Sequence, residues 1–459
     1  MGDRFSPKFK HKQWREGRAL HCVNGGVWVV LEKKLCPNCF RPDCYEPGGT
    51  CNECGYVEQK QRNESALLEG HILKDRYYVG RVLGSGGFGI TYLAYDNKTT
   101  KTRAVKEFFP REWVRRMDDH MRVKFKDSDR AEMYHRGLEV FVNEARVLGN
   151  MTTDPVIVNV SDFFRENNTA YIVMEFLQGM TLAEYMNKKG RLFEEKQALS
   201  VVKGIAGPLQ ELHELGLLHR DISPDNVMIM DNNSLKLIDF GAIRQYSGHD
   251  RKSMSVLVKP GFAPPEQYDD KGQQGPWTDV YALAATYYYM VTGKQPVPSM
   301  TRLKEDILIP LHERNSALSE KISQVMAHAM VLDHKDRIQS MTEFVKELKK
   351  AEGIAIPVPY LKLNVEGESR QWKFEADQDI HMGRSSNDCE ICVQGPDVSR
   401  IHCMVRYDSY KGCFVVTDKS ANGTYTENGL IGKGRSTNVK PGGKLYLVSK
   451  RYELFLEVK

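Results

Sequence analysis

The alternation of hydrophobic and polar residues divides the chain into regions with different expected structures. Between residues 75 and 350 the pattern is first strand-like, as in Ile90–Tyr95, and then takes on helical spacing. The longest apolar run, Val280–Val291, is interrupted by Thr286 and is shorter than the ~18–20 residues that a membrane span requires. We therefore predict an α+β domain over 75–350 with a buried helix in this run, and no membrane span.

A different pattern covers the C-terminal part of the chain. After a proline-containing connector, Ile354–Pro359, residues 361–459 contain short alternating runs separated by Gly, Asn and Asp. Short runs of period two between such turn residues are typical of all-β domains. We predict a linker over 351–360 and an all-β domain over 361–459.

The N-terminal part differs from both. Residues 1–20 contain six Lys or Arg and two acids, whereas residues 21–60 contain six of the ten cysteines together with Gly, Pro and Asn. Basic, weakly apolar segments do not bury enough surface to fold alone. We predict a basic flexible tail over 1–20 and a small separate unit over 21–60.

Composition adds limits on partners and location. The chain has 459 residues, with 65 Lys and Arg against 60 Asp and Glu, so its formal net charge is +5. Most of that excess lies in residues 1–20, and the remainder is nearly neutral, so we expect no nucleic-acid partner. The first residues lack the apolar segment of a secretion signal, which favours a cytoplasmic protein.

Four cysteines form a C-x2-C-x11-C-x2-C pattern: Cys36, Cys39, Cys51 and Cys54. Two residues between ligands let one tight turn direct two thiolates at one ion, and two such turns complete a tetrahedral site suited to structural Zn²⁺. Residues 21–60 thus resemble a zinc ribbon. An iron–sulfur cluster or unbound thiols are the alternatives, and Cys44 is either a spare thiol or a replacement for one of the four.

A glycine-rich motif and three further motifs follow one another in the large domain. Gly84, Gly86 and Gly89 form G-x-G-x-x-G, a motif that dinucleotide-binding proteins also use, but they open a helix after it, whereas here a strand is predicted. A glycine loop between strands can lie close over phosphates because its residues lack Cβ atoms. Downstream are Lys106 at the end of an apolar run, the sequence HRDISPDN at His219–Asn226, and DFG at Asp239–Gly241.

In this order and spacing the motifs resemble those of bacterial serine/threonine protein kinases of the eukaryotic type. The resemblance covers residues 75–350 and implies a two-lobed fold that transfers the γ-phosphate of ATP, with Mg²⁺ or Mn²⁺, to hydroxyls of protein substrates. Two alternatives are a kinase for small-molecule hydroxyls and a non-catalytic pseudokinase scaffold.

The resemblance also implies roles for single residues. Asp221 would accept or orient the proton of the substrate hydroxyl, and Lys106 would hold the α- and β-phosphates with the help of Glu144. An insertion separates Lys106 from Glu144, and Glu139 is the alternative partner. The remaining implied contacts are Mg²⁺ ligation by Asn226 and Asp239, phosphate binding by Gly84, Gly86 and Gly89, adenine binding by the hinge at Met174–Leu177, chiefly Glu175 and Leu177, and structural roles for Asp279 and for a Glu266–Arg337 pair.

Two departures from the family pattern occur together. Serine/threonine kinases carry a lysine two residues after the catalytic aspartate, where this chain has Ser223, and a threonine in the activation segment, where it has Lys259. The two positions are neighbours in the family. Our hypothesis is that Lys259 is a further catalytic residue that supplies the missing ammonium group. The alternative is that Lys259 only selects substrates.

Arg220, which precedes the catalytic aspartate, implies control by phosphorylation of the activation segment. The segment 242–263 contains no threonine, and we predict Ser253 and Ser255, beside two basic residues, as autophosphorylation sites. Autophosphorylation would be compatible with a dimer. The alternative is a basic loop that is never phosphorylated.

The C-terminal domain contains three motifs in order: Gly383-Arg384, Ser399-Arg400-x-His402 and Asn422-Gly423. They resemble those of a forkhead-associated (FHA) domain, an all-β sandwich that binds phosphothreonine peptides. A guanidinium and a hydroxyl suit a phosphate, so the resemblance assigns it to Arg384 and Ser399, and the peptide backbone to Asn422. The implied partners are phosphothreonine proteins other than the chain's own activation segment. The alternative is a sandwich that has lost binding.

Overall fold

The computed structural model describes residues 35–57 without 47, 64–150, 154–239, 258–355 without 270–271, 358–448 without 366–367, and 452–459, and for 12–15, 18–23, 27–31 and 244–245 only the backbone strands. The chain divides into two compact units, one formed by residues 1–318 and 326–339 and the other by 319–325 and 340–459. Each unit is described separately below.

The first strands of the chain form a small antiparallel sheet of β1 (Lys12–Arg15), β2 (Arg18–Val23) and β3 (Val27–Leu31). The sequence suggested a flexible tail over 1–20, but β1 and the start of β2 lie within that range. The β-branched run of β3 explains the difference, because it provides β2 with a strand-forming partner.

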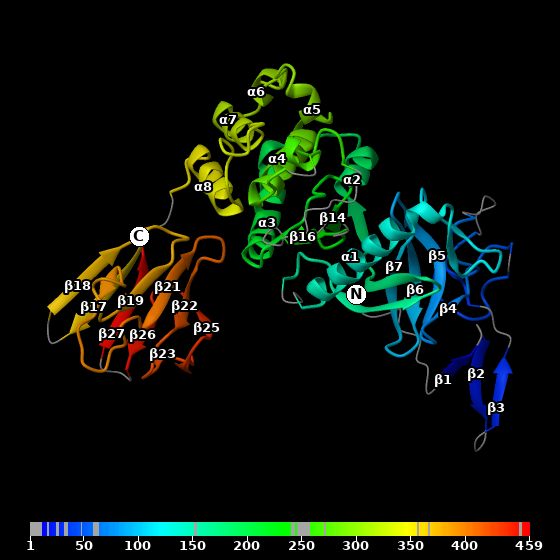
Figure 1. Ribbon diagram of the computed structural model, residues 1–459, viewed down its shortest axis with the longest axis horizontal. Helices are drawn as coiled ribbons and strands as arrows, with labels where there is room; N and C mark the ends of the chain where they lie inside the picture. The colour runs from blue at the N-terminus through cyan, green and yellow to red at the C-terminus, as the bar shows by residue number, and fades with distance from the viewer. Residues whose placement is uncertain are drawn as a thin grey trace. The chain divides into compact units, whose positions relative to one another are not determined.

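The predicted two-lobed fold begins with a six-stranded sheet in the order β10-β11-β7-β6-β5-β4. Figure 1 labels β4, β5, β6 and β7 of this sheet. Helix α1 (Ala131–Asn150) packs against β10 and β11. The strands are β4 (Ile72–Leu73), β5 (Tyr77–Ser85), β6 (Gly89–Asp96), β7 (Lys101–Phe108), β10 (Val160–Glu166) and β11 (Thr169–Glu175).

The insertion between β7 and α1 folds as a hairpin of β8 (Val114–Arg116) and β9 (Val123–Phe125), followed by a 3-10 turn at Ser128–Arg130. Arg116 on β8 is buried and forms a bidentate ion pair with Glu107 on β7, at 2.7 and 2.6 Å. Its guanidinium also donates to the carbonyl of Ser65 at 2.6 Å. One buried charge pair therefore joins the insertion, the sheet and the segment that precedes the sheet.

We expect Arg116→Ala to lower the free energy of unfolding of this lobe by about 3–5 kcal/mol, because it leaves the buried Glu107 carboxylate without its charge partner. Urea denaturation followed by tryptophan fluorescence measures the change. Arg122→Ala is the matched control, since Arg122 pairs with Asp119 at the surface of the same hairpin. Equal destabilisation by the two variants would contradict the expectation.

The second lobe is mainly helical (Figure 1). The predicted buried helix is confirmed, because the run Val280–Val291 lies in α4 (Pro276–Thr292) and is almost wholly buried. The other helices of this unit are α2 (Leu182–Lys189), α3 (Glu195–Glu214), α5 (Ser299–Arg302) and α6 (Leu311–Arg314), whereas α7 (Glu320–Ala329) is divided between the two units and α8 (Met341–Ala351) lies in the second. The short strands are β12 (Gly179–Thr181), β13 (Leu217–Leu218), β14 (Val227–Met230), β15 (Leu235–Leu237) and β16 (Arg244–Gln245), and a 3-10 turn spans Pro265–Gln267.

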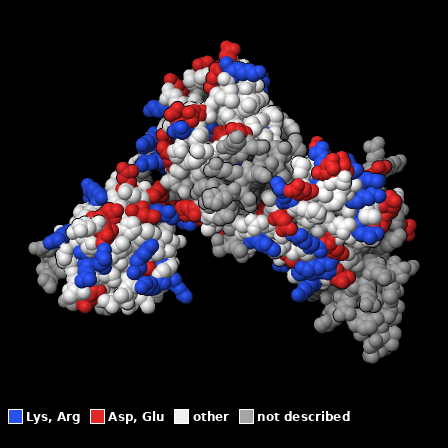
Figure 2. All heavy atoms as spheres, in the orientation of Figure 1, with Lys and Arg blue, Asp and Glu red and all other residues white. Residues whose placement is uncertain are grey.

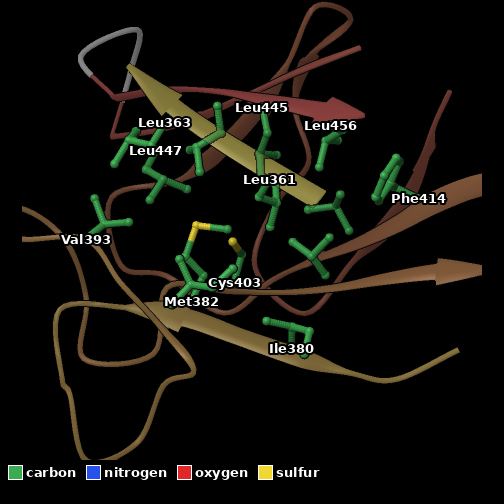
Figure 3. Packing of buried hydrophobic residues seen from close by; sticks show 14 of the residues in the cluster. Leu361, Leu363, Ile380, Met382, Val393, Cys403, Phe414, Leu445, Leu447 and Leu456 are labelled. Carbon is green, nitrogen blue, oxygen red and sulfur yellow. The ribbon is translucent and has the colours of Figure 1, made fainter. Parts of the chain in front are cut away.

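The C-terminal domain is the expected all-β fold, with two sheets in the orders β18-β17-β27-β26-β23-β24 and β20-β19-β21-β22-β25. Figure 3 shows how leucines of the first sheet, such as Leu361 and Leu445, face Met382 and Cys403 of the second. The strands are β17 (Pro359–Val365), β18 (Glu368–Lys373), β19 (Ile380–Gly383), β20 (Ile391–Cys392), β21 (Cys403–Asp408), β22 (Cys413–Asp418), β23 (Thr424–Thr426), β24 (Gly429–Leu430), β25 (Ser436–Val439), β26 (Lys444–Leu447) and β27 (Tyr452–Val458).

Two further observations concern the surface. Among the described residues, no helix has both the length and the apolar run that crossing a bilayer demands. On the face shown in Figure 2, Lys and Arg side chains are interspersed with Asp and Glu over the described surface.

Candidate active site

The glycine-rich motif lies at the turn between β5 and β6, so it has the strand–loop–strand context that the sequence predicted. The Gly86 amide donates to the Gly89 carbonyl at 2.9 Å, which closes the loop. A Cβ atom on Gly89 would lie 2.7 Å from the Glu107 carbonyl, whereas Gly84 and Gly86 face open space. The loop can therefore approach a ligand with its backbone.

Below this loop is a cavity of about 700 Å³, which adjoins a second one of about 500 Å³ on the hinge side. This is the size range of ligand-binding pockets. Most of the predicted nucleotide and catalytic residues line one or both cavities: Gly84, Gly86, Gly89, Lys106, Glu144, Glu175, Leu177, Asp221, Asn226, Asp239 and Lys259.

Lys106 lies on β7 and forms an ion pair with Asp239. Burial alone would lower the pKa of Lys106, but the nearby carboxylates of Asp239 and Glu144 raise it. Lys106 is therefore a cation in this site. Among the described residues, the ion pair to Glu144 that the resemblance implied is not formed, because Lys106 is engaged by Asp239 instead.

Glu144 lies on α1 and is buried beside the cavity. Burial raises its pKa to about 8, against the opposing effect of Lys106. Its Oε2 atom has no hydrogen-bond partner among the described residues. The alternative residue, Glu139, is exposed and pairs with Arg165 at 2.7 Å. Of the two glutamates, Glu144 is thus the one that faces Lys106.

Asp221 and Asn226 are held together in the catalytic loop. The Asn226 amide nitrogen donates to the Asp221 side chain at 2.8 Å and to its carbonyl at 2.7 Å. Burial raises the pKa of Asp221 to about 6, with Lys259 opposing the shift and Asp239 adding to it. The aspartate is therefore mainly ionised at neutral pH and sensitive to mild acid.

The buried carboxylate of Asp279 on α4 fixes the start of this loop. It accepts hydrogen bonds from the amides of His219 and Arg220 at 2.9 and 2.8 Å, and it contacts His213 Nε2 at 2.7 Å. Arg220 adopts a positive φ of 68°, which is uncommon for a residue with a side chain. Three contacts to one buried carboxylate explain how the loop keeps this conformation.

Lys259 reaches the catalytic loop from the activation segment. Its Nζ atom lies 2.8 Å from Ser223 Oγ, 3.3 Å from Asp225 Oδ2 and 3.9 Å from Asp221 Oδ1. The two positions at which the sequence departs from the family pattern are therefore in direct contact. A second basic side chain besides Lys106 therefore lines the cavity, beside Asp221.

The hinge is anchored by the side chain of Glu175. Its carboxylate accepts from the Asn159 amide at 2.8 Å and pairs with Lys236. Its own amide donates to the Asn159 carbonyl at 3.0 Å. The Glu175 side chain is thus engaged by Asn159 and Lys236. A ligand in the adjoining cavity would therefore contact backbone groups of Glu175 and Leu177.

The activation segment is only partly described. The predicted phosphorylation sites Ser253 and Ser255 lie outside the described residues. The end of the segment is anchored by the predicted Glu266–Arg337 pair, which is buried and bidentate at 2.7 and 3.2 Å. Sequence reasoning missed Gln274, whose side-chain oxygen accepts from Arg220 Nε. No motif marks that residue.

The four predicted zinc ligands converge. Their Sγ atoms all lie within 4.8 Å of one another, with 3.7 Å between Cys36 and Cys54 and 3.8 Å between Cys39 and Cys51. A tetrahedral site with Zn–S bonds of about 2.3 Å requires S–S distances of about 3.8 Å, so the thiols fit a zinc ion. Cys44 Sγ lies 3.2 Å from the Arg41 carbonyl, 3.5 Å from Cys51 Sγ and 4.0 Å from Cys39 Sγ. Cys44 is therefore a fifth thiol beside the four predicted ligands.

In the C-terminal domain the three predicted motifs meet at one end of the sandwich. Ser399 Oγ accepts from the Ala421 amide at 3.1 Å, and the Asn422 side chain donates to the Asp397 carbonyl at 2.8 Å. A Cβ on Gly383 would lie 2.2 Å from the Arg400 carbonyl, which explains the glycine. Arg384, the next residue, is exposed beside these loops.

The buried His402 connects these loops. It accepts from the Ser399 amide at 3.2 Å, and its Nε2 lies 3.1 Å from the Gly423 carbonyl. The C-x2-C pair Cys389 and Cys392 favoured core positions in the sequence, but both thiols are only half-buried and donate to the carbonyls of Arg400 and Arg384. Their C-x2-C spacing was the only signal, and it does not distinguish a loop support from a core position.

Comparisons with known proteins agree with this geometry. Residues 77–348 match the protein kinase domain family, and residues 380–447 match the FHA domain family. Serine/threonine-protein kinase F of Synechocystis sp. is 30% identical over 304 residues, which are 61% of this chain and 56% of that protein. Serine/threonine-protein kinase PrkC of Bacillus subtilis is 27% identical over 292 residues, 62% of this chain and 42% of that protein.

A solved structure described as the apo form of PpkA-294 is similar as well. It has a TM-score of 0.55 and 33% sequence identity, and the match covers 62% of this chain and 99% of that one. The chain spans about half the length of the curated relatives that it matches. The chain therefore belongs to the protein kinase family, its relatives include bacterial serine/threonine-protein kinases, and it carries an FHA domain in its C-terminal part.

Proposed function

We propose that the chain transfers the γ-phosphate of ATP to serine or threonine hydroxyls of protein substrates. The observation that carries the proposal is the cavity under the glycine-rich loop, where Lys106, Asp221, Asn226 and Asp239 all contribute to the wall. Phosphoryl transfer depends on positioning and on neutralising charge, and this wall offers both.

Each residue has a task in this reaction. Asp221, ionised at neutral pH, accepts the proton of the attacking hydroxyl, and Asn226 fixes its orientation through the 2.8 Å hydrogen bond. Asn226 and Asp239 would hold Mg²⁺, which neutralises phosphate charge when bound. The carbonyl of Glu175 and the amide of Leu177 would bind the adenine edge.

The Lys106–Asp239 pair suggests how the site responds to nucleotide. Asp239 is needed for the metal and Lys106 for the phosphates, so binding of Mg-ATP would separate this pair. Lys106 then turns to Glu144, whose buried Oε2 atom has no other partner among the described residues. A lysine in contact lowers the pKa of Glu144 from about 8, so this carboxyl ionises as the pair forms.

Radiolabelled ATP tests the reaction class. The full chain is incubated with labelled ATP, Mg²⁺ and a generic protein substrate, and phosphoamino acids are then identified. Label on serine or threonine supports the proposal. Label only on small molecules indicates a kinase for small hydroxyls, and no transfer under any condition indicates a non-catalytic scaffold.

The proposal includes the domain organisation: a basic segment over 1–20 that contains β1 and the start of β2, a zinc-binding unit over 21–60, a kinase domain over 75–350, a linker over 351–360 and an FHA domain over 361–459. It also includes Zn²⁺ held by the four clustered thiols, and autophosphorylation at Ser253 and Ser255. Mass spectrometry of an active preparation tests the two serines, since intact unmodified peptides would exclude them.

We further propose that the FHA domain binds phosphothreonine proteins through Arg384, Ser399 and Asn422. Arg384 is exposed and its amide donates to the Ser399 carbonyl at 3.0 Å, so neighbouring residues offer a phosphate a charged donor and a neutral one. Asn422 is positioned by its bond to Asp397 and presents its remaining polar atoms to the peptide backbone.

We expect Arg384→Ala to weaken binding of a phosphothreonine peptide at least about tenfold, as expected for loss of a charged hydrogen-bond donor. Calorimetric titration of the full chain measures the affinity. Lys411→Ala is the matched control, because Lys411 lies at the far end of the β21–β22 hairpin from these loops. Equal peptide affinity in both variants would refute the assignment.

A further inference from the structure

The strand that leads into the glycine-rich loop has an irregularity where it meets the cysteine-rich unit. β5 pairs with β6 up to Val79 and again from Val82, with a shift of register between them. The amide of Arg81, within that bulge, donates instead to the carbonyl of Pro37 at 3.0 Å. Pro37 lies between the ligands Cys36 and Cys39, so β5 is hydrogen-bonded directly to the first cysteine turn.

The residue before this bond, Gly80, fits only because it lacks a side chain. A Cβ atom there would lie 2.1 Å from the Pro37 carbonyl and 2.9 Å from the ring of Phe40. Gly80 does not line the cavities, so its absent side chain is explained by the contact with the cysteine turn. The contact is therefore built into the sequence of both segments.

Asn38 extends the connection to the second cysteine turn. Its Oδ1 atom accepts from Arg81 Nε at 2.6 Å, and its Nδ2 atom donates to Cys54 Sγ at 3.5 Å. The side chain thus joins β5 to a thiol of the proposed zinc site. A thiolate held by a metal keeps this acceptor in a fixed position.

Apolar packing extends the contact toward the nucleotide cavity. Leu35 and Phe40 form a cluster with Tyr78, Leu93 and Tyr95, and the half-buried Leu83 and Phe176 pack against it. The last two residues line the cavity on the hinge side. Movement of the cysteine turn would therefore displace Leu83 and Phe176, which line the proposed adenine site.

We propose that the turn Cys36–Phe40 is a positioning element for nucleotide binding: when its thiols hold zinc, it fixes β5 and with it the glycine-rich loop. The inference rests on the proposed nucleotide site. A unit this small gains most of its folding energy from the metal, so loss of zinc releases β5 at Arg81. The affinity for ATP then falls, while the catalytic loop in the other lobe is unchanged.

Asn38→Ala tests the connection without removing a metal ligand. We expect the dissociation constant of a fluorescent ATP analogue and the KM for ATP to rise about three- to tenfold, the effect of losing one or two hydrogen bonds. The kcat and the zinc content stay as in the wild type. Asn52→Ala is the control, because Asn52 is an exposed asparagine between the two cysteines of the second turn. Equal affinities in the two variants would overturn the proposal.

Hydrogen–deuterium exchange of the full chain, with and without a zinc chelator, gives a readout that needs neither activity nor nucleotide. Faster exchange at residues 80–86 after chelation supports the positioning role, and unchanged exchange there overturns it. Gly80→Ala serves as a second variant, in which the same residues exchange faster although all four thiols remain. If the chain binds no nucleotide at all, the proposed function fails, and the exchange data still decide the positioning role.

Discussion

Asp221→Asn is expected to lower kcat about 10²–10⁴-fold, the usual contribution of a positioned general base. Asparagine has nearly the same shape but cannot take the proton of the substrate hydroxyl. Because the Asn226 amide donates to Asp221 at 2.8 Å, the loop keeps a hydrogen-bonding partner and need not rearrange. The KM for ATP should therefore stay within about twofold, as expected for a group that acts in the transition state. Initial rates with labelled ATP measure both constants.

The pH dependence of the wild type gives an independent check. The pKa of Asp221 is raised to about 6 by burial, and the proposed general base acts as the carboxylate. The rate should therefore be constant above neutral pH and fall as the pH drops through about 6. In Asp221→Asn this acid limb should be absent.

Asp231→Asn is the control, since this exposed aspartate lies in the turn after β14. It should keep the wild-type rate and pH profile. If Asp221→Asn retained more than a tenth of the wild-type kcat, Asp221 would not be the base. If the wild type itself transferred no phosphate, the scaffold interpretation would be correct.

The parts of the site that the sequence predicted well are those set by short-range geometry. Asp221 and Asn226 share one loop, so their distance hardly depends on the rest of the fold. The glycine-rich motif was correctly placed between two strands, because the alternation after Gly89 continues as a strand. The two cysteine turns are likewise local, and each places two thiols without help from other elements.

Contacts between distant segments were less predictable. Lys106 pairs with Asp239 rather than with Glu144. Both carboxylates are near Lys106, so the positions of α1 and of the segment that carries Asp239 determine which of them it contacts. No pattern along the chain encodes those positions. The buried Glu107–Arg116 pair was missed for the same reason, since its two residues lie on different strands, β7 and β8.

The contact of the cysteine turn with β5 shows a third limit. In the sequence Gly80 resembles an ordinary glycine in a strand. The need for glycine there comes from the Pro37 carbonyl, more than forty residues earlier, which leaves no room for a Cβ atom. The departures at Ser223 and Lys259 are the exception among distant pairs. The sequence predicted their proximity, because both residues depart from the kinase family pattern at positions that are neighbours in that family. The two side chains lie 2.8 Å apart.

The contact between Lys259 and Ser223 leads to a second prediction, on the rate of phosphoryl transfer. We expect Lys259→Thr to lower kcat about 10- to 10³-fold, because the site loses a cation beside the group in transfer. It should also move the acid limb of the pH–rate profile upward: Lys259 lowers the pKa of Asp221, so without it the carboxylate protonates at higher pH. A residue that only shaped the activation segment would not shift that limb.

The sharpest control restores the family's own arrangement. In Ser223→Lys/Lys259→Thr the ammonium group returns to the catalytic loop and the threonine to the activation segment. The hydrogen bond between the two positions is kept, with the donor now at position 223 and the hydroxyl acceptor at position 259. We expect this double variant to recover most of the kcat lost in Lys259→Thr, and to return the acid limb to about pH 6. A double-mutant cycle with Ser223→Lys gives the coupling between the two sites. If the two effects were simply additive, Lys259 would act independently of position 223, and the replacement of one lysine by the other would be excluded.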